Sequence, residues 1–418
     1  MAERDAAGVA RERGRARRLR AWGWGMMRVR GARVSLARTA LLALALAAGA
    51  THARAQRPAR LVDARATRET RALFGGLQRL RRTHVLYGHQ DDLAYGLRWW
   101  AHPGRSDVKE VAGSYPAVYG WELGNLELGR PASLDSVDFA AMRRWIVEGY
   151  ERGGVITISW HMANPRTGGN AWDTAGAVST ILPGGARHAE YRRWLDRFAA
   201  FNAGLRGSRG EPVPIIFRPF HEMSGGWFWW GAGHASPDEY RALWRFTVRY
   251  LRDEKGVHNL LWAYSPNAAD DFEAAYWARY PGDEYVDVLG LDEYFWRPRP
   301  GDTADAGARL RDHLRLVSAA ADARGKLPAL TETGYESIPD SAWWTGTLLR
   351  ALEGDPATRR IAYVLTWRNA NESTNHPGHF YAPYPGHPSA ADFVRFRASE
   401  RILFESDLPD LYGRRKRR

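Results

Sequence analysis

The sequence contains no cysteine among its 418 residues. A disulfide framework and a lipid-anchored amino-terminal cysteine are therefore both excluded. The stability of the protein must come from a packed core instead. With 44% hydrophobic and 12% aromatic residues, the chain has ample material for a large one.

The body of the chain also lacks a surplus of charge. Of the net charge of +13, residues 1–55 contribute +9 through twelve Arg against three acids, and residues 414–418 contribute +5 as a basic tail. Residues 56–413 are thus left with a net charge of −1. A nucleic-acid-binding body needs a basic surface, so the sequence predicts no nucleic-acid partner.

The apolar run near the amino end is short. Residues 39–50 form a twelve-residue stretch without charge, preceded by several Arg and followed by Ala53-Arg54-Ala55. Twelve residues are too few to span a bilayer, whereas a basic region, a short apolar run and an A-x-A site are typical of a secretory signal peptide. We expect cleavage after Ala55, no membrane span in the mature protein and a secreted or periplasmic location.

The start of translation stays open at this level. Translation could start at Met1, Met26 or Met27, because the Arg-rich residues before Met26 add nothing that a signal peptide needs. Residues 1–55 are therefore interpreted as an extension plus the signal peptide, and residues 56–413 as a single catalytic domain.

The mature chain alternates strand-like and helix-like segments. A strand is expected at residues 84–90, 116–123, 154–161, 214–222, 259–266, 286–294, 328–334 and 361–369. Most of these are near-continuous apolar runs, which is typical of strands covered on both faces in a parallel sheet. Amphipathic segments lie between them, the clearest at residues 236–255, where Ser236, Pro237 and Glu239 form a capping-box pattern.

Eight strand–helix units in one chain predict the α/β class and a single (β/α)8 TIM barrel. A doubly wound open sheet is the alternative. Its Gly-rich fingerprint is absent, because Gly88-His89-Gln90-Asp91-Asp92 stands after the first strand. The barrel is therefore the favoured fold.

Catalytic groups of such barrels lie at the carboxyl ends of the strands. Two of the expected strands end in a glutamate within a distinctive pattern. Glu222 follows Arg218 and His221 in the fourth, and Glu332 lies in Leu-Thr-Glu-Thr-Gly in the seventh. Each alone could be a structural ion pair. Together they form the carboxylate pair, about 5–5.5 Å apart, that a retaining glycosidase needs.

Other chemistries lack their motifs. The sequence has no H-E-x-x-H metal motif and no G-x-S-x-G nucleophile elbow, and its strand-end His residues stand singly. We expect no cofactor and no catalytic metal. Whether calcium binds near paired acids such as Asp91 and Asp92 or Asp270 and Asp271 stays open.

The motifs resemble those of a known family. The segments Arg218-Pro-Phe-His-Glu-Met223 and Gly226-Trp-Phe-Trp-Trp-Gly231, together with Thr331-Glu-Thr-Gly334, are similar to glycoside hydrolase family 26, chiefly β-mannanases. The resemblance extends over most of the mature chain, from Gly88-His-Gln90 to Ser406-Asp-Leu-Pro-Asp-Leu-Tyr412.

The resemblance implies roles for individual residues. Glu222 would be the acid/base and Glu332 the nucleophile, with Tyr294 as a hydrogen-bond donor that keeps Glu332 ionised. Trp227 would stack on the leaving sugar, and its ring could raise the pKa of Glu222 by excluding water. Arg218 is expected to support the site.

Four further residues are expected to contact substrate. Trp367 would form the floor under the sugar that is attacked, since apolar sugar faces stack on aromatic rings. His161 and the preceding Trp160 would contact the sugar as well. His221 would hydrogen-bond to the sugar or to a catalytic glutamate. Core packing is the structural alternative for each of them.

These features predict a secreted, monomeric endo-β-1,4-mannanase that acts on β-mannan by double displacement with retention. Another β-glycanase specificity of the same family, for mixed-linkage β-glucan or β-1,3-xylan, is the nearest alternative. A non-catalytic carbohydrate-binding protein is less favoured, because binding alone needs no pair of facing glutamates.

Overall fold

The structure, a computed structural model, describes residues 60–295, 306–373 and 376–413. The predicted extension and signal peptide at residues 1–55 and the basic tail at residues 414–418 lie outside the described residues. No helix in the described ranges is long and apolar enough to cross a membrane.

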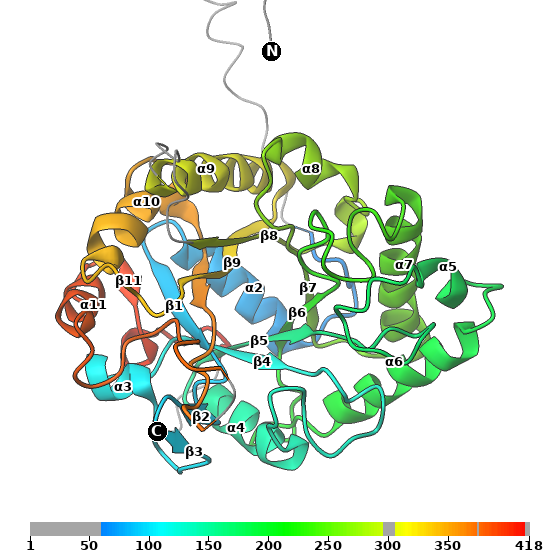
Figure 1. The fold of residues 1–418 in the computed structure, drawn as a ribbon, viewed down its shortest axis with the longest axis horizontal. Coiled ribbons are helices and arrows are strands. Elements are labelled where there is room, and N and C mark those ends of the chain that lie inside the picture. The colour runs from blue at the N-terminus through cyan, green and yellow to red at the C-terminus, as the bar shows by residue number, and fades with distance from the viewer. Residues whose placement is uncertain (1–59, 296–305, 374–375, 414–418) are drawn as a thin grey trace, which may run out of the picture. The chain divides into compact units, whose positions relative to one another are not determined.

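Eight parallel strands form a closed barrel (Figure 1). Each barrel strand pairs with the barrel strand that comes before it and the one that comes after it along the chain. The last strand, β10, pairs with the first, β1, where Leu86 lies opposite Tyr363. This closure confirms the (β/α)8 barrel and excludes the open sheet. The strands are β1 (Val85–Gln90), β4 (Val118–Glu122), β5 (Val155–Trp160), β6 (Ile215–Pro219), β7 (Leu260–Tyr264), β8 (Val288–Phe295), β9 (Leu327–Tyr335) and β10 (Tyr363–Thr366).

Helices surround the barrel (Figure 1). They are α2 (Arg68–Leu80), α3 (Asp107–Ala112), α4 (Phe139–Glu151), α5 (Val178–Ile181), α6 (His188–Ala203), α7 (Pro237–Arg249), α8 (Phe272–Ala278), α9 (Ala306–Arg324), α10 (Arg350–Glu353) and α11 (Ala390–Arg397). Short accessory strands are β2 (Tyr95–Gly96) paired with β3 (Trp99–Trp100), and β11 (Ile402–Leu403) beside β1.

Local sequence signals explain these elements. Six of the eight barrel strands are buried at every position, and β8 and β9 are buried at all positions but one, as the apolar runs predicted. At the start of α7, the Ser236 hydroxyl accepts from the backbone of Glu239, and the Glu239 side chain returns the bond, so the predicted capping box is present. Helix α7 continues as one π-helical turn, Tyr250–Glu254, before Gly256 ends it in the left-handed region.

The pairing of β8 with β9 contains an irregularity beside the site. Leu291 pairs with Leu330, but the next residue, Asp292, pairs with Glu332, so Thr331 is an extra residue on β9. The Thr331 hydroxyl donates to Oδ1 of Asp292 at 2.7 Å, which places it on the barrel-interior side together with Glu332. Such a bulge re-aims the side chains that follow it.

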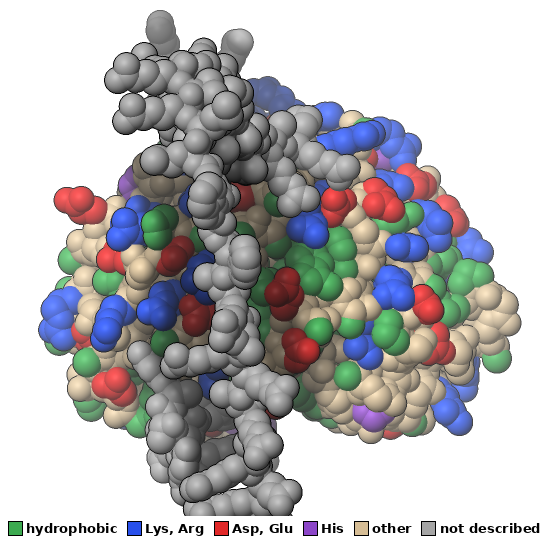
Figure 2. Space-filling view, turned by 90° about the horizontal axis from the view of Figure 1, so that it is seen from above, with side chains coloured by type: hydrophobic (Ala, Val, Ile, Leu, Met, Phe, Trp, Pro, Cys, Tyr) green, Lys and Arg blue, Asp and Glu red, His purple; other side chains and the backbone are tan. Residues whose placement is uncertain are grey.

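Charges of both signs are interspersed on the visible face of the described residues (Figure 2). Basic and acidic side chains lie side by side there rather than in one basic patch. This distribution agrees with the net charge of −1 for residues 56–413.

Candidate active site

Glu222 lies on a turn just beyond the end of β6. The strand ends at Pro219 rather than at residue 222, because Phe220 and Glu222 adopt left-handed backbone angles, with φ of 52° and 54°. The Glu222 amide donates to the Ser265 carbonyl at 2.8 Å, which ties the turn to the loop after β7. Left-handed angles are costly for residues other than glycine, so this turn is held by its surroundings.

Glu332 lies within β9 and is held by two donors, Tyr294 from the adjacent strand β8 and Arg218 from β6. The Tyr294 hydroxyl donates to its Oε2 at 2.8 Å, and the guanidinium of Arg218 forms an ion pair with its Oε1. A second nitrogen of the same guanidinium donates to Oδ2 of Asp292 at 2.8 Å. Both expected supporting roles, of Tyr294 for Glu332 and of Arg218 for the site, agree with these contacts.

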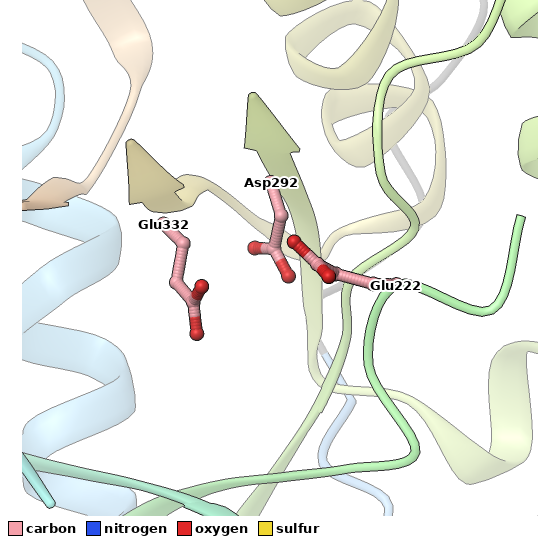
Figure 3. A group of neighbouring side chains, drawn as sticks. All are labelled: Glu222, Asp292 and Glu332. Atoms are coloured by element: carbon pink, nitrogen blue, oxygen red, sulfur yellow. The ribbon is translucent and has the colours of Figure 1, made fainter. Parts of the chain in front are cut away.

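Glu222, Asp292 and Glu332 converge at the barrel mouth. One carboxylate oxygen of each lies within 4.8 Å of those of the other two. Figure 3 shows Glu222 reaching toward the same space as Asp292 and Glu332 from the opposite side. The spacing is close to the about 5–5.5 Å of retaining glycosidases and well short of the about 6.5–9.5 Å of inverting ones. The buried guanidinium of Arg218 supplies the positive charge between Asp292 and Glu332.

The electrostatic surroundings favour the protonated form of Glu222. Burial and the negative charges of Glu332 and Asp292 raise the pKa of Glu222 well above its usual value. Trp227 acts in the opposite direction, because its Nε1 donates to Oε2 of Glu222 at 2.7 Å and so lowers the pKa. This hydrogen bond was not predicted from the sequence, because it depends on the direction of the indole edge, and its effect on the Glu222 pKa is opposite to that of burial.

Asp292 is a third titratable group of the site. Burial raises its pKa to about 7, with Arg218 opposing and Glu332 reinforcing the shift. Its two oxygens accept from Thr331 at 2.7 Å and from Ser265 at 3.1 Å. Asp292 thus shares the charge of Arg218 with Glu332, and its own negative charge contributes to the raised pKa of Glu222.

A histidine pair lies beside the glutamates. His161 Nδ1 bonds to Oε2 of Glu122 at 2.8 Å, and its Nε2 lies 3.0 Å from Nε2 of His221. Burial opposes protonation of His161, but the charge and hydrogen bond of Glu122 and the charges of Glu332 and Asp135 together raise the His161 pKa. Burial, Arg218 and His161 lower the pKa of His221 well below its usual value. These opposite shifts favour a proton on Nε2 of His161, which can then donate to Nε2 of His221.

A cavity of about 1100 Å³ opens above these groups. Six of the eight predicted site residues line it, namely His161, Glu222, Trp227, Tyr294, Glu332 and Trp367. The rings of His161 and Trp367 are neighbours in its lining, in edge-to-face contact with centroids 6.1 Å apart. A cavity of this size, lined by aromatic rings and a few polar groups, suits a chain of several sugar units.

Trp160 and His221 do not line the cavity. Trp160 is fully buried, stacks on Phe198 of α6 and donates to Glu127 at 2.9 Å, so the expected substrate contact is wrong. Alternation along β5 turns it toward the helices while its neighbours face the barrel. His221 is buried, and its ring bonds to the ring of His161. It reaches neither a glutamate nor the cavity, so the expected contact with the sugar or with a catalytic glutamate is wrong.

Several lining residues were not singled out from the sequence. Trp172 is 49% exposed and stacks on His161 with ring centroids 5.3 Å apart, while Phe228 and Tyr381 pack nearby. Trp172 lies in a long loop whose path the sequence pattern does not reveal. Glu122, at the end of β4, does not line the cavity and was not predicted as a site residue, although its position in register with Ser159 could have suggested the contact with His161.

Fold and site together define a (β/α)8 glycoside hydrolase with two facing glutamates. The model of the family described as "Glycosyl hydrolase family 26" matches residues 62–345. The chain belongs to glycosyl hydrolase family 26, as the motif resemblance indicated.

Sequence relatives share this family. A "Mannan endo-1,4-beta-mannosidase" of Bifidobacterium adolescentis is 37% identical over 359 residues, which cover 82% of this chain and 35% of the relative. One of the same name from Bacillus subtilis is 34% identical over 201 residues, 46% of this chain and 54% of the relative. The chain thus spans only part of the length of both relatives.

Solved structures show the same architecture. A GH26 beta-mannanase from Bacteroides ovatus is 45% identical and superposes with a TM-score of 0.78, over 84% of this chain and 99% of that one. A modular endo-beta-1,4-mannanase from Cellulomonas fimi is 38% identical, with a TM-score of 0.75 over 85% and 79% of the two chains.

Proposed function

We propose that this chain is an endo-β-1,4-mannanase that cleaves β-mannan with retention of anomeric configuration. The observation that carries the proposal is the facing pair Glu222 and Glu332, with oxygens within 4.8 Å, at the base of an aromatic-lined cavity. The names of the relatives in two comparisons support mannan as the substrate.

In the first step, Glu332 attacks the anomeric carbon and forms a covalent bond to the sugar. Tyr294 and Arg218 orient the Glu332 carboxylate through a hydrogen bond and an ion pair. The bond to the departing oxygen breaks, and Glu222 gives its proton to that oxygen. The raised pKa of Glu222 favours the protonated form that this step needs.

In the second step, water releases the sugar from Glu332. Glu222, now a carboxylate, takes a proton from the attacking water, and Glu332 leaves as a carboxylate. The Trp227 indole donates to Glu222, which stabilises its charged form at this stage. The half-buried Trp367 lines the cavity beside His161 and offers a ring face to the reacting sugar.

We further propose a secreted or periplasmic, monomeric enzyme with residues 1–55 removed on export, residues 56–413 as the catalytic domain and residues 414–418 as a solvated tail. The pattern of basic residues, apolar run and Ala53-Arg54-Ala55 supports export. Amino-terminal sequencing of exported protein should give Gln56, and a mature end elsewhere would refute the cleavage site.

The test of the substrate is direct. Purified protein is incubated with β-mannan, mixed-linkage β-glucan and β-1,3-xylan, and the release of reducing ends is measured. We expect release from mannan as a mixture of oligosaccharides of several lengths, which marks internal cleavage. Release from glucan or xylan without release from mannan would show that mannan is not the substrate. No release from any of the three polymers would refute the proposed glycanase activity.

A further inference from the structure

The cavity extends beyond the reacting glutamates to a set of polar residues that the mechanism does not use. Asp270, Glu293, Arg309 and His313 line it together, and we refer to these four residues as the outer arm. Asp270 follows β7, Glu293 belongs to β8, and Arg309 and His313 belong to α9. Both strand ends and the helix therefore contribute to one continuous space.

Strand alternation explains why Glu293 faces the outer arm. Its neighbours Asp292 and Tyr294 point into the barrel mouth, so the side chain between them points toward α9. Glu293 is only 2% exposed. Its two oxygens accept from Arg309 Nε at 3.1 Å and from His313 Nδ1 at 2.8 Å. A buried carboxylate thus fixes two donors at the edge of the cavity.

Arg309 and His313 lie four residues apart on α9, which places them on one face of the helix. The His313 ring is also fixed by stacking on Phe272, with centroids 4.1 Å apart. Arg309 uses only Nε on Glu293, and its side chain is 43% exposed. A guanidinium has five N–H groups, so its two terminal nitrogens remain available toward the cavity, as they bond to no residue that the structure describes.

The outer arm lies on the leaving-group side of the site. The loop that carries Asp270 is tied to the Glu222 turn, because Asn267 Oδ1 accepts from the Gly225 amide at 2.7 Å and Ser265 accepts from Glu222. The acid/base lies next to the departing oxygen. Sugar units that continue past that oxygen on this side therefore run toward Asp270 and Arg309.

The charges of the outer arm suit a neutral, hydroxyl-rich ligand. The positive charge of Arg309 is matched by Glu293, and exposed Asp270 adds an acceptor that bonds to no other described residue. Guanidinium donors and a carboxylate acceptor in one place can bind neighbouring hydroxyls of a sugar. An anionic substituent would instead meet the negative charges of Asp270 and Glu293.

We propose that the outer arm is a binding site for a sugar unit of the departing chain, beyond the unit next to Glu222, with Arg309 as its specificity-determining donor. This inference rests on the proposed function, since it adds a subsite to the same cavity. Glu293 acts through Arg309 and His313 and is a positioning residue.

The test compares long and short leaving groups. Arg309→Ala is assayed on mannohexaose, whose departing portion can reach the outer arm, and on 4-nitrophenyl β-mannobioside, whose aryl leaving group ends beside Glu222. We expect kcat/KM on the hexasaccharide to fall about tenfold, as for loss of a hydrogen bond to a charged group. The value on the aryl glycoside should stay within about twofold.

Cleavage position supplies a second readout. With end-labelled mannohexaose, Arg309→Ala should shift cleavage toward products with fewer units on the leaving side. Asp270→Ala removes an exposed side chain without a described bond, so the variant should fold normally. We expect it to lower the ratio of kcat/KM on mannohexaose to kcat/KM on the aryl glycoside by about threefold. Arg315→Ala is the matched control, because Arg315 lies on the same helix but faces a separate groove with Asp312.

Equal losses on both substrates, or no loss on either, would overturn the outer arm while leaving the proposed function intact. If the wild type cuts another β-glycan instead of mannan, the ratio is measured with oligosaccharides and the aryl glycoside of that polymer. A drop for Arg309→Ala alone would then support the outer arm. A wild type that cuts no β-glycan would overturn both proposals.

Discussion

The indole Nε1 of Trp227 donates a hydrogen bond of 2.7 Å to Oε2 of Glu222, although the Trp227 ring itself is 41% exposed. One side chain thus offers a face to the cavity and a donor to the carboxylate. The hydrogen bond favours the charged form of Glu222, while burial, Glu332 and Asp292 favour the protonated form.

Replacing the donor but keeping the ring separates these effects. In Trp227→Phe the bond that lowers the Glu222 pKa is lost, so that pKa should rise. Because Glu222 must be protonated for the first step, the alkaline limb of the pH profile of kcat/KM should move to higher pH. The profile of Trp172→Phe, a lining residue without a bond to Glu222, is the control and should not move. A shift to lower pH would contradict this account.

The two glutamates should fail in different ways. Glu332→Ala should abolish turnover on every substrate, since no nucleophile remains. Glu222→Ala should lower the rate on mannan by on the order of 10²–10⁴-fold. It should retain more activity on 2,4-dinitrophenyl β-mannobioside, whose leaving group departs without a proton. Wild-type rates of Glu222→Ala on mannan would remove the acid/base assignment.

Retention is measurable in the first product. Proton NMR during hydrolysis of mannohexaose should show the β-anomer of the new reducing end first, followed by mutarotation. The close approach of the Glu222 and Glu332 oxygens, within 4.8 Å, is the reason for this expectation. Initial appearance of the α-anomer would mean inversion and would leave Glu332 without its nucleophilic role.

Arg218 should matter for stability as well as catalysis. Arg218→Met leaves buried Asp292 and Glu332 without their shared partner, so unfolding in urea should show a loss of about 3–5 kcal/mol. Asp292 has a pKa of about 7, so it can protonate below that pH, and the loss should be larger at pH 8 than at pH 5. Arg187→Met removes an exposed pair with Glu190 and should cost less than about 1 kcal/mol.

The pair of His161 and Glu122 should stabilise the fold within a limited pH range. The His161 pKa is raised, so its contribution is full below the ordinary value of 6.5 and is lost as the pH rises through the folded value. The Glu122 pKa is lowered by His161 despite burial, so its contribution is present above 4.5 and is lost at lower pH.

Glu122→Gln should therefore lower the free energy of unfolding by about 1–3 kcal/mol, with the largest loss between pH 4.5 and 6.5. Urea titrations at several pH values measure it. The histidine NMR signal of His161 should also titrate at lower pH in the variant. A loss that does not vary with pH would point to packing rather than charge.

Much of the fold was predictable because its signals are local. Each barrel strand is an apolar run. Helix α7 begins at a capping box that Ser236 and Glu239 form, with Pro237 in the first turn. Glu222 and Glu332 were predictable as a pair because each follows or lies within a strand, and parallel strands deliver their carboxyl ends to one side.

The remaining part of the site depends on the direction of single side chains. Trp160 and His161 are consecutive, yet one faces the helices and the other the cavity, and the sequence does not say which. His221 precedes Glu222 on a turn with left-handed angles, which turns its ring below the cavity floor. Trp172 reaches His161 from a loop, where no periodic pattern fixes position.

The extra residue Thr331 on β9 increases the number of polar side chains that this strand places at the barrel mouth. In a regular strand, side chains on one face recur every second residue, about 6.6 Å apart. The bulge instead turns Thr331 and Glu332 to the same face, so consecutive residues serve Asp292 and the cavity. Substitutions that regularise the pairing of β8 and β9 should then yield a stiffer sheet with poorer turnover, because the imperfect ladder is what concentrates polar groups there.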